Sequence, residues 1–261
     1  MTETPHGQIA ELAASTLLLV AHGSIDPEAQ ESTRALAHAV VLSRTASRVE
    51  VAYLRHARPR ARQVLRTLAE AGHDRVVVVP LLLTSAFHAR VDLPRALGDP
   101  SALVPVVTPV LGAPSSTPDR RLVAALRRRL AELDVAFDAV VVAAAGSSDT
   151  EACSSVTAMA SALGADLRLP CLAGFASTAS PTTGEAVTQL RHAGARRVAV
   201  ASCCLAPGLL FRRAVDSATA AGAVGVSEPL GDAPELVGLV LERFHEAHDG
   251  RTPPEGPPRP E

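Results

Sequence analysis

An internal duplication is the feature that most restricts the fold of this chain. Residues 17–29 (LLLVAHGSIDPEA) match residues 140–152 (VVVAAAGSSDTEA) at a constant offset of 123, and residues 76–94 match residues 198–216. Since both halves of the 261-residue chain carry the same succession of segments, we expect two similar domains. Each would have about 120 residues, which is an ordinary domain size.

Each half alternates apolar runs with longer, charge-striped segments, the pattern of a parallel sheet with crossover helices. The runs are continuously apolar, which indicates strands covered by helices on both faces. The predicted strands are 16–21, 48–54, 75–82 and 103–107, then 138–144, 166–171, 197–203 and 223–227. The predicted helices are 26–43, 59–71, 90–98 and 117–133, then 149–163, 182–193, 209–221 and 232–248. Pro59 suits a first helical turn, and Gly72 a helix end. The predicted fold class is therefore α/β, with a parallel four-stranded sheet flanked by helices in each domain.

The repeat also predicts the domain boundaries. We expect an N-terminal domain over residues 15–134 that carries the functional site, and a C-terminal repeat domain over residues 135–248. Residues 1–14 and the proline-rich residues 249–261 are predicted to be disordered, because their composition offers little apolar surface to bury.

Composition excludes several classes of function. A net charge of −2, with no tryptophan and one tyrosine, offers neither a basic field nor a stacking surface for nucleic acid. The chain has no apolar run of about 18 residues and no signal-like N-terminus, so we expect a cytoplasmic protein that does not contact membranes. Its four cysteines form no CxxC pair and are expected to be small buried side chains.

Two histidines stand at strand ends in the first half only. His22 follows the strand 16–21 directly, and His88 lies in the predicted loop after the strand 75–82, whereas Ala145 replaces His22 in the second copy. Ligands of parallel sheets bind outside the carboxyl ends of the strands, so both imidazoles would reach one cleft if the strands are neighbours. Two such ligands would hold a divalent ion weakly. The alternative is a structural, hydrogen-bonded role for each histidine.

The residues around the first histidine have a structural interpretation. Gly23 and Ser24 recur in the second half and suit a tight strand-to-helix turn, and Asp26 suits a helix cap.

The segments VAHGSIDPEA and PLLLTSAFHARVDLP resemble the two signatures of the sirohydrochlorin chelatases. These class II chelatases insert Fe²⁺ or Co²⁺ into the precursor of siroheme or cobalamin. The second signature is the more specific, with apolar Pro80–Leu83, then His88, Arg90 and the run Asp92–Pro94. The resemblance covers nearly the whole chain, because longer bacterial members are also duplicated and also lack the histidines in the second copy.

The resemblance implies that His22 and His88 bind the incoming metal and help to remove two pyrrole protons. The metal is then a substrate, with no permanently bound cofactor, and the partners are sirohydrochlorin and a divalent ion. The resemblance further implies a cleft between the two domains for the macrocycle, in a monomer or a homodimer. The residues expected to bind substrate are Arg55, Arg58, Arg90, Ser24 and Ser85.

The chain departs from the family at Arg55, which occupies the position of the usual carboxylate in the stretch Tyr53–Pro59. An arginine neither ligates a cation nor acts as a base at neutral pH. Arg55 can bind a substrate carboxylate, can be an exposed residue of no consequence, or can mark weakened or altered activity. Its neighbour His56 can substitute only if the strand end is irregular, because successive strand residues point to opposite faces.

The first functional hypothesis is a lyase, a sirohydrochlorin ferrochelatase of siroheme biosynthesis, with the cobaltochelatase of cobalamin biosynthesis as the alternative. A non-catalytic tetrapyrrole or metal carrier is the hypothesis from another class, and Arg55 motivates it. A ferrochelatase of the haem pathway fits less well, because those chains are longer and have a single copy with different motifs.

Overall fold

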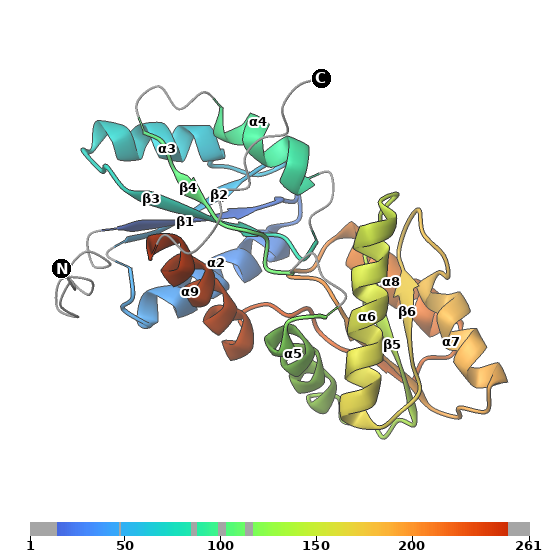
Figure 1. Cartoon of the computed structure of the whole chain (residues 1–261). Coiled ribbons are helices and arrows are strands. Elements are labelled where there is room, and N and C mark those ends of the chain that lie inside the picture. The colour runs from blue at the N-terminus through green and yellow to red at the C-terminus, as the bar shows by residue number, and fades with distance from the viewer. Residues whose placement is uncertain (1–14, 47, 85–87, 99–102, 113–116, 250–261) are drawn as a thin grey trace. The chain divides into compact units, whose positions relative to one another are not determined.

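The computed structural model describes residues 15–46, 48–84, 88–98, 103–112 and 117–249 of the chain. The chain divides into two compact units (Figure 1). Unit 1 comprises residues 1–111 and 237–261, and unit 2 comprises residues 112–236.

Unit 1 is built on a parallel four-stranded sheet with the strand order β2-β1-β3-β4. Its strands are β1 (Thr16–Ala21), β2 (Arg48–Tyr53), β3 (Val76–Leu81) and β4 (Val106–Val107). Its helices are α2 (Pro27–Leu42), α3 (Ala61–Glu70), the π-helix η1 (His88–Asp92), α4 (Leu93–Leu97) and most of α9 (Pro234–His248).

Unit 2 repeats this sheet with the order β6-β5-β7-β8, again entirely parallel. Its strands are β5 (Ala139–Ala144), β6 (Cys171–Phe175), β7 (Val198–Ser202) and β8 (Gly225–Val226). Its helices are α5 (Arg120–Ala131), α6 (Thr150–Leu167), α7 (Thr183–His192) and α8 (Leu209–Ala220). The predicted α/β class with two parallel four-stranded sheets is confirmed.

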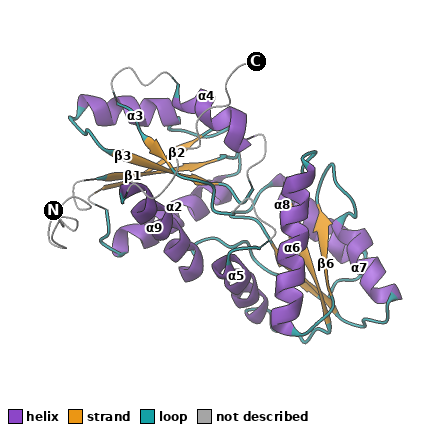
Figure 2. Ribbon diagram, viewed as in Figure 1, coloured by secondary structure: helices purple, strands orange, loops and turns teal. Residues whose placement is uncertain are grey.

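Helices cover both faces of each sheet (Figure 2). In unit 1, Leu18 and Val20 of β1 pack in one cluster with Leu65, Leu68 and Leu93 from α3 and α4. The intervening strand residues point toward the opposite face, which α2 and α9 cover (Figure 1). In unit 2, α7 and α8 cover one face and α5 and α6 the other. The central strands are completely buried, which explains their continuous apolar sequence.

The last helix of each sequence half does not stay with its half. The helix α5, which follows β4 in the chain, packs on β7 and α6 in unit 2. The helix α9, which follows β8, lies almost entirely in unit 1, where the Nε group of Arg243 is 3.4 Å from the carbonyl oxygen of Val110. The compact units therefore differ from the sequence halves 15–134 and 135–248 by an exchange of these two helices.

Three local predictions need correction. The predicted strand 166–171 is wrong, since α6 continues to Leu167, and the strand β6 begins only at Cys171. Arg168 ends α6 in a left-handed conformation. The sequence pattern does not predict this helix end, because a residue other than glycine occupies the left-handed position. Pro59 precedes its helix instead of occupying its first turn, and its carbonyl oxygen accepts a hydrogen bond from the Tyr53 amide. His88 begins η1 instead of lying in a loop.

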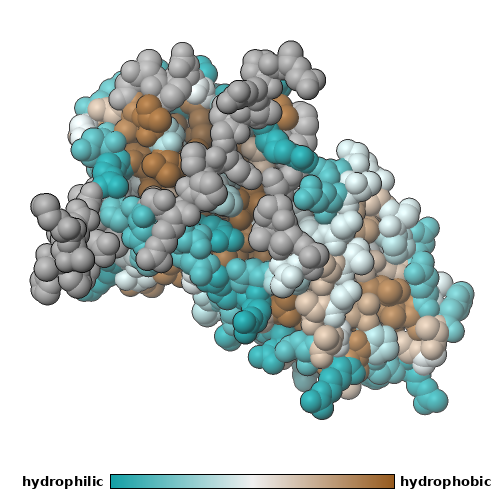
Figure 3. All heavy atoms as spheres, viewed as in Figure 1, coloured by the Kyte–Doolittle hydropathy of each residue, from teal (hydrophilic) through white to brown (hydrophobic). Residues whose placement is uncertain are grey.

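None of the helices in the described part of the chain is both long enough and apolar enough to cross a membrane. The side of unit 2 formed by α6 is pale in Figure 3, because alanine, serine and threonine dominate that helix.

Candidate functional site

The carboxyl edge of the unit 1 sheet brings three chain segments together. Strand β1 lies between β2 and β3, and its last residue, Ala21, pairs with Tyr53 on one side and with Leu81 on the other. The segments that follow these strands therefore leave the sheet side by side. These are the segments that begin with His22 and Leu54 and the one that leads to His88, so the condition that the sequence analysis set, neighbouring strands before the two histidines, is met.

His22 is held by the turn that follows β1. Its Nδ1 lies 3.0 Å from the carbonyl oxygen of Gly23, and because a carbonyl only accepts, Nδ1 carries the proton and Nε2 is the basic nitrogen. Gly23 has a φ of +88°, which favours glycine, and a Cβ at this position would overlap the carbonyl oxygen of Arg55. The side chain of His22 is half-buried.

The two polar residues that follow have structural partners. The hydroxyl of Ser24 accepts a hydrogen bond from the Asp26 amide at 3.1 Å, as Ser147 does from Asp149 in unit 2. The Asp26 carboxylate caps α2 by accepting from the Glu28 amide at 3.0 Å, which confirms its predicted role. Contact between Ser24 and substrate stays a prediction.

The end of β2 is irregular. The Arg55 amide donates to the carbonyl oxygen of His22 at 2.8 Å, and the Ala57 amide donates back to the carbonyl oxygen of Arg55 at 2.7 Å. This second bond closes a γ-turn with His56 at its centre, and His56 has a φ of +59°. The turn leaves the imidazole of His56 exposed, with its ring centre 5.9 Å from that of His22 and the two planes tilted by 44°. His56 can take the place of the carboxylate only if the strand end is irregular, and the end of β2 is irregular.

Arg55 forms an ion pair with Asp92, the last residue of η1. The Nη2 group donates to Oδ1 of Asp92 at 2.7 Å, and the carboxylate is almost fully buried at 5% exposure, whereas the arginine side chain is half exposed. Asp92 belongs to the second signature, so this pair ties the segment that contains His88 to the end of β2. Sequence reasoning missed the pair, because 37 residues separate its members and no local pattern links them.

The other predicted site residues lie on the same side of unit 1 or outside the described residues. Arg58 follows the γ-turn and is exposed, and Arg90 is exposed on η1. The backbone of His88 begins η1, a helix type that often occurs at functional sites. Ser85 lies outside the residues that the structure describes.

Unit 2 repeats the backbone turns of this site but lacks the two signature histidines. Gly146 again has a positive φ, +84°, and a Cβ there would overlap the carbonyl oxygen of Ser177, the counterpart of Arg55. A γ-turn follows around Thr178, whose φ is +34°. Ala145 and Leu210 stand at the positions of the two signature histidines. The turns therefore belong to the scaffold, and the histidines are specific to unit 1.

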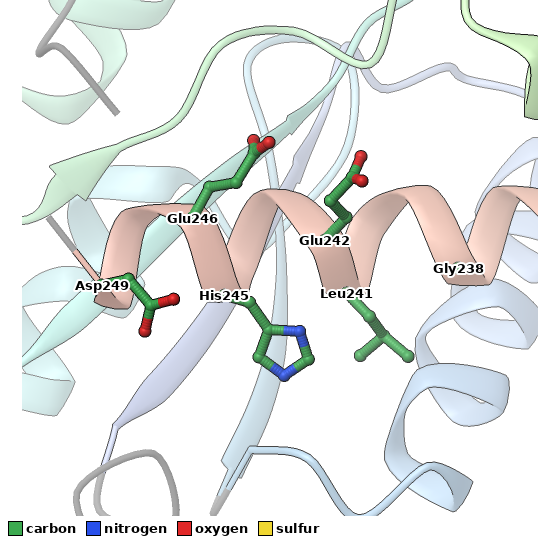
Figure 4. A pocket seen from close by; sticks show the side chains of 6 residues that line it. All are labelled: Gly238, Leu241, Glu242, His245, Glu246 and Asp249. Carbon is green, nitrogen blue, oxygen red and sulfur yellow. The ribbon is translucent and has the colours of Figure 1, made fainter. Parts of the chain in front are cut away.

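A shallow pocket on α9 also contains titratable groups, but it does not form a ligand set (Figure 4). Glu242 and Glu246 point to one side of the helix, and His245 and Asp249 point to the other. Arg243 pairs with Glu246 at 2.9 Å. Within the described ranges, no three histidine, cysteine or acidic side chains gather as metal ligands would.

Two of the cysteines, Cys171 and Cys203, are unreactive thiols near neutral pH. Burial raises the pKa of the Cys203 thiol to about 12 and that of the Cys171 thiol to about 12, so both stay protonated near neutral pH. A protonated thiol is a poor nucleophile and a poor metal ligand. Cys203 is fully packed, with its Sγ 3.7 Å from the Met159 sulfur, which confirms the prediction of a small buried side chain there.

Known proteins match most of the chain. A sirohydrochlorin cobaltochelatase of Priestia megaterium is 28% identical over 210 residues, which cover 76% of this chain and 66% of that protein. One of Saccharolobus solfataricus is 40% identical over 82 residues, covering 31% of this chain and 62% of that protein. The chain thus spans slightly less than two thirds of the length of each of these relatives.

Solved structures show the same fold. SirB from Bacillus subtilis with Fe³⁺ has a TM-score of 0.74 at 23% identity, covering 92% of this chain and 99% of SirB. The sirohydrochlorin chelatase SirB from the subspecies spizizenii, in complex with cobalt, has a TM-score of 0.73 at 22% identity, covering 90% of this chain and 96% of that one. The family model CbiX matches residues 16–133 and again residues 139–247. Because these two matches cover most of its sequence, the chain belongs to the CbiX family.

Proposed function

We propose that this chain is a sirohydrochlorin chelatase, a lyase that inserts Fe²⁺ into the tetrapyrrole, with Co²⁺ as the alternative metal. One observation carries the proposal. The two signature histidines follow adjacent parallel strands of unit 1, while unit 2 repeats the backbone and lacks them. The names of the sequence relatives and of the SirB structures, which include both an iron and a cobalt complex, support the same activity.

The chemistry suits imidazole. Insertion replaces two pyrrole N–H protons by one M²⁺ ion, so the site must hold the ion, release it to four nitrogens and accept protons near neutral pH. Imidazole does all three, and a site with few protein ligands does not retain the ion. The hydrogen bond from Nδ1 of His22 to Gly23 leaves Nε2 as the nitrogen that can bind the ion or take up a proton.

The polyanionic macrocycle requires cations at the rim of the site. Arg58 and Arg90 are exposed near the carboxyl edge of unit 1, and guanidinium groups bind carboxylates in a bidentate manner. The Arg55 side chain is half exposed, and its remaining N–H groups can also donate to substrate. The cleft between the two sequence halves, the cytoplasmic location and the oligomeric state stay predictions.

The test is the insertion reaction itself. Mixing sirohydrochlorin with Fe²⁺ or Co²⁺ under anaerobic conditions shifts the main absorption band, and we expect the protein to accelerate this shift. His22→Ala and His88→Ala should each lower the rate to that of the uncatalysed reaction. His192→Ala, an exposed histidine at the end of α7 in unit 2, is the matched control and should keep the full rate.

The outcome also separates the enzyme from the carrier. A folded wild-type chain that binds sirohydrochlorin tightly but does not exceed the uncatalysed rate would contradict the proposal and favour the carrier. The pair of changes Arg55→Glu and Asp92→Asn would then restore the family carboxylate without placing it against a second, buried carboxylate. A gain of activity would identify a weakened enzyme. Comparing initial rates with the two ions would identify the preferred metal.

A further inference from the structure

His56 lies where a third metal-facing group would be needed. The family carboxylate is replaced by Arg55, whose guanidinium pairs with Asp92. The adjacent residue, His56, instead has its ring beside that of the signature residue His22. The two residues lie in the segments that follow the neighbouring strands β1 and β2, at the edge where ligands of parallel sheets bind.

The distance between the two rings fits a shared ion. A first-row metal lies about 2.0–2.1 Å from an imidazole nitrogen and so about 3.2 Å from the ring centre, which allows two ligating rings at most about 6.4 Å between centres. The observed separation is 5.9 Å. The spacing of the two ring centres is therefore compatible with one ion bound by both rings, with one nitrogen of each ring facing it.

The backbone holds His56 in this position. The residue sits at the centre of a γ-turn with a φ of +59°, a conformation that non-glycine residues adopt infrequently. The loop is closed again at its far end, where the Tyr53 amide donates to the carbonyl oxygen of Pro59 at 3.0 Å. In unit 2 the same turn carries Thr178, so the scaffold supplies the geometry and unit 1 alone supplies an imidazole.

The local charge also permits a cation. Arg55 would repel a divalent ion if its charge were not compensated, because it precedes His56 directly. Its ion pair with the carboxylate of Asp92, at 2.7 Å, compensates that charge locally. The imidazole of His56 is exposed, so an ion can reach it from solvent and leave it again.

We propose that His56 is a metal-binding residue of this chain, which together with His22 binds the incoming divalent ion in place of the missing carboxylate. This inference rests on the proposed function for its biological meaning, but metal binding can be tested without the tetrapyrrole. The ion would then meet neutral imidazoles instead of a carboxylate, and the site would hold it weakly enough for transfer.

The experiment is a titration of the full chain with Co²⁺ alone, followed by calorimetry and by the visible absorption of the bound ion. The informative variant is His56→Asn, because asparagine tolerates the positive φ of the turn but removes the imidazole. We expect its dissociation constant for Co²⁺ to rise about tenfold or more, with a changed absorption band. His192→Asn, the same substitution at an exposed histidine of unit 2, should bind Co²⁺ as the wild type does. Thermal unfolding of both variants checks that the fold is retained, and His56→Gly provides a second variant that fits the turn.

Each result decides the matter. Cobalt affinity and spectrum unchanged in both His56→Asn and His56→Gly would overturn the inference, as would an equal loss in His192→Asn or no measurable cobalt binding by the wild type. The insertion assay distinguishes a failure of the His56 metal-binding inference from a failure of the proposed chelatase function. If the wild type accelerates insertion and His56→Asn raises the KM for the metal more than it lowers kcat, both hold. If the wild type binds Co²⁺ through His56 but accelerates nothing, the metal site stands and the chelatase proposal fails.

Discussion

At the scale of single residues, the pairing of Arg55 with Asp92 changes the meaning of the departure from the family sequence. An arginine in the position where the resemblance implies a metal-facing carboxylate suggests damage when only the sequence is considered. In the structure its guanidinium compensates a buried carboxylate that belongs to the second signature. In unit 2 the corresponding residues are Ser177 and Ala214, so both members of the pair are absent together.

This pair should contribute to stability mainly by protecting Asp92. We expect Arg55→Met to lower the free energy of unfolding by about 1–2 kcal/mol, because the buried carboxylate loses a charged partner that is itself half exposed. Adding Asp92→Asn should recover most of this loss, because no uncompensated charge then remains. Urea denaturation of the two single variants and the double variant measures the coupling. Arg58→Met serves as the exposed control, and strictly additive effects would show that the two side chains do not interact.

At the scale of secondary-structure elements, the site depends on how β1 and β2 end. Both strands pass directly into turns that contain a positive φ, at Gly23 and at His56, and the two turns are joined by the hydrogen bond from the Arg55 amide to the carbonyl oxygen of His22. The close approach of the Arg55 carbonyl leaves no room for a side chain at position 23. The glycine therefore sets the spacing between the two histidine-bearing turns.

Two glycine-to-alanine substitutions distinguish the steric overlap with the Arg55 carbonyl from the cost of placing alanine at a positive φ. Gly72 has nearly the same φ, +80°, but a Cβ there would meet nothing within 4 Å. We expect Gly72→Ala to cost about 1–2 kcal/mol, the usual penalty of a left-handed alanine. Gly23→Ala should cost at least about 2 kcal/mol more, because a backbone carbonyl must move. Urea unfolding measures both, and equal costs would contradict the proposed close approach.

The sequence predicts most of these elements and fails at identifiable places. Continuous apolar runs such as VVVVPLLL specify buried strands, and Asp26 and Gly72 mark helix ends, because these signals are local. The end of α6 was misplaced because Arg168 adopts a left-handed conformation that needs tertiary support. The approach of His56 to His22 depends on the γ-turn that ends β2, and a hydrogen bond to the distant residue His22 holds this turn. The alternation of side chains along a regular strand cannot predict such a turn.

At the scale of the whole molecule, the exchange of α5 and α9 separates the sequence repeat from the compact unit. The apolar face of the unit 1 sheet is covered by a helix made more than 100 residues after its strands, and Phe244 on that helix is completely buried. The sequence around α5 and α9 does not predict which sheet each helix covers, because both helices have a similar apolar face and each sheet has a face that needs a helix. The repeat therefore predicts the number of units but not the assignment of their last helices.

Two shortened chains test this arrangement. A chain of residues 15–134 contains one whole sequence half, and a chain that joins residues 15–112 through a flexible linker to residues 234–249 contains unit 1 with α9. We expect the second to unfold cooperatively, with a higher melting temperature than the first, because it covers both faces of the sheet. Circular dichroism during heating compares them. A more stable 15–134 chain would show that α5 can replace α9.

The exchange also has a consequence for synthesis on the ribosome. Unit 2 is complete once residue 236 has been made, whereas the first unit to be translated must wait for the final helix before both faces of its sheet are covered. Domains usually fold in the order in which they emerge. Here the histidine-bearing unit would be the last to close, because its sheet stays partly uncovered until α9 has left the ribosome.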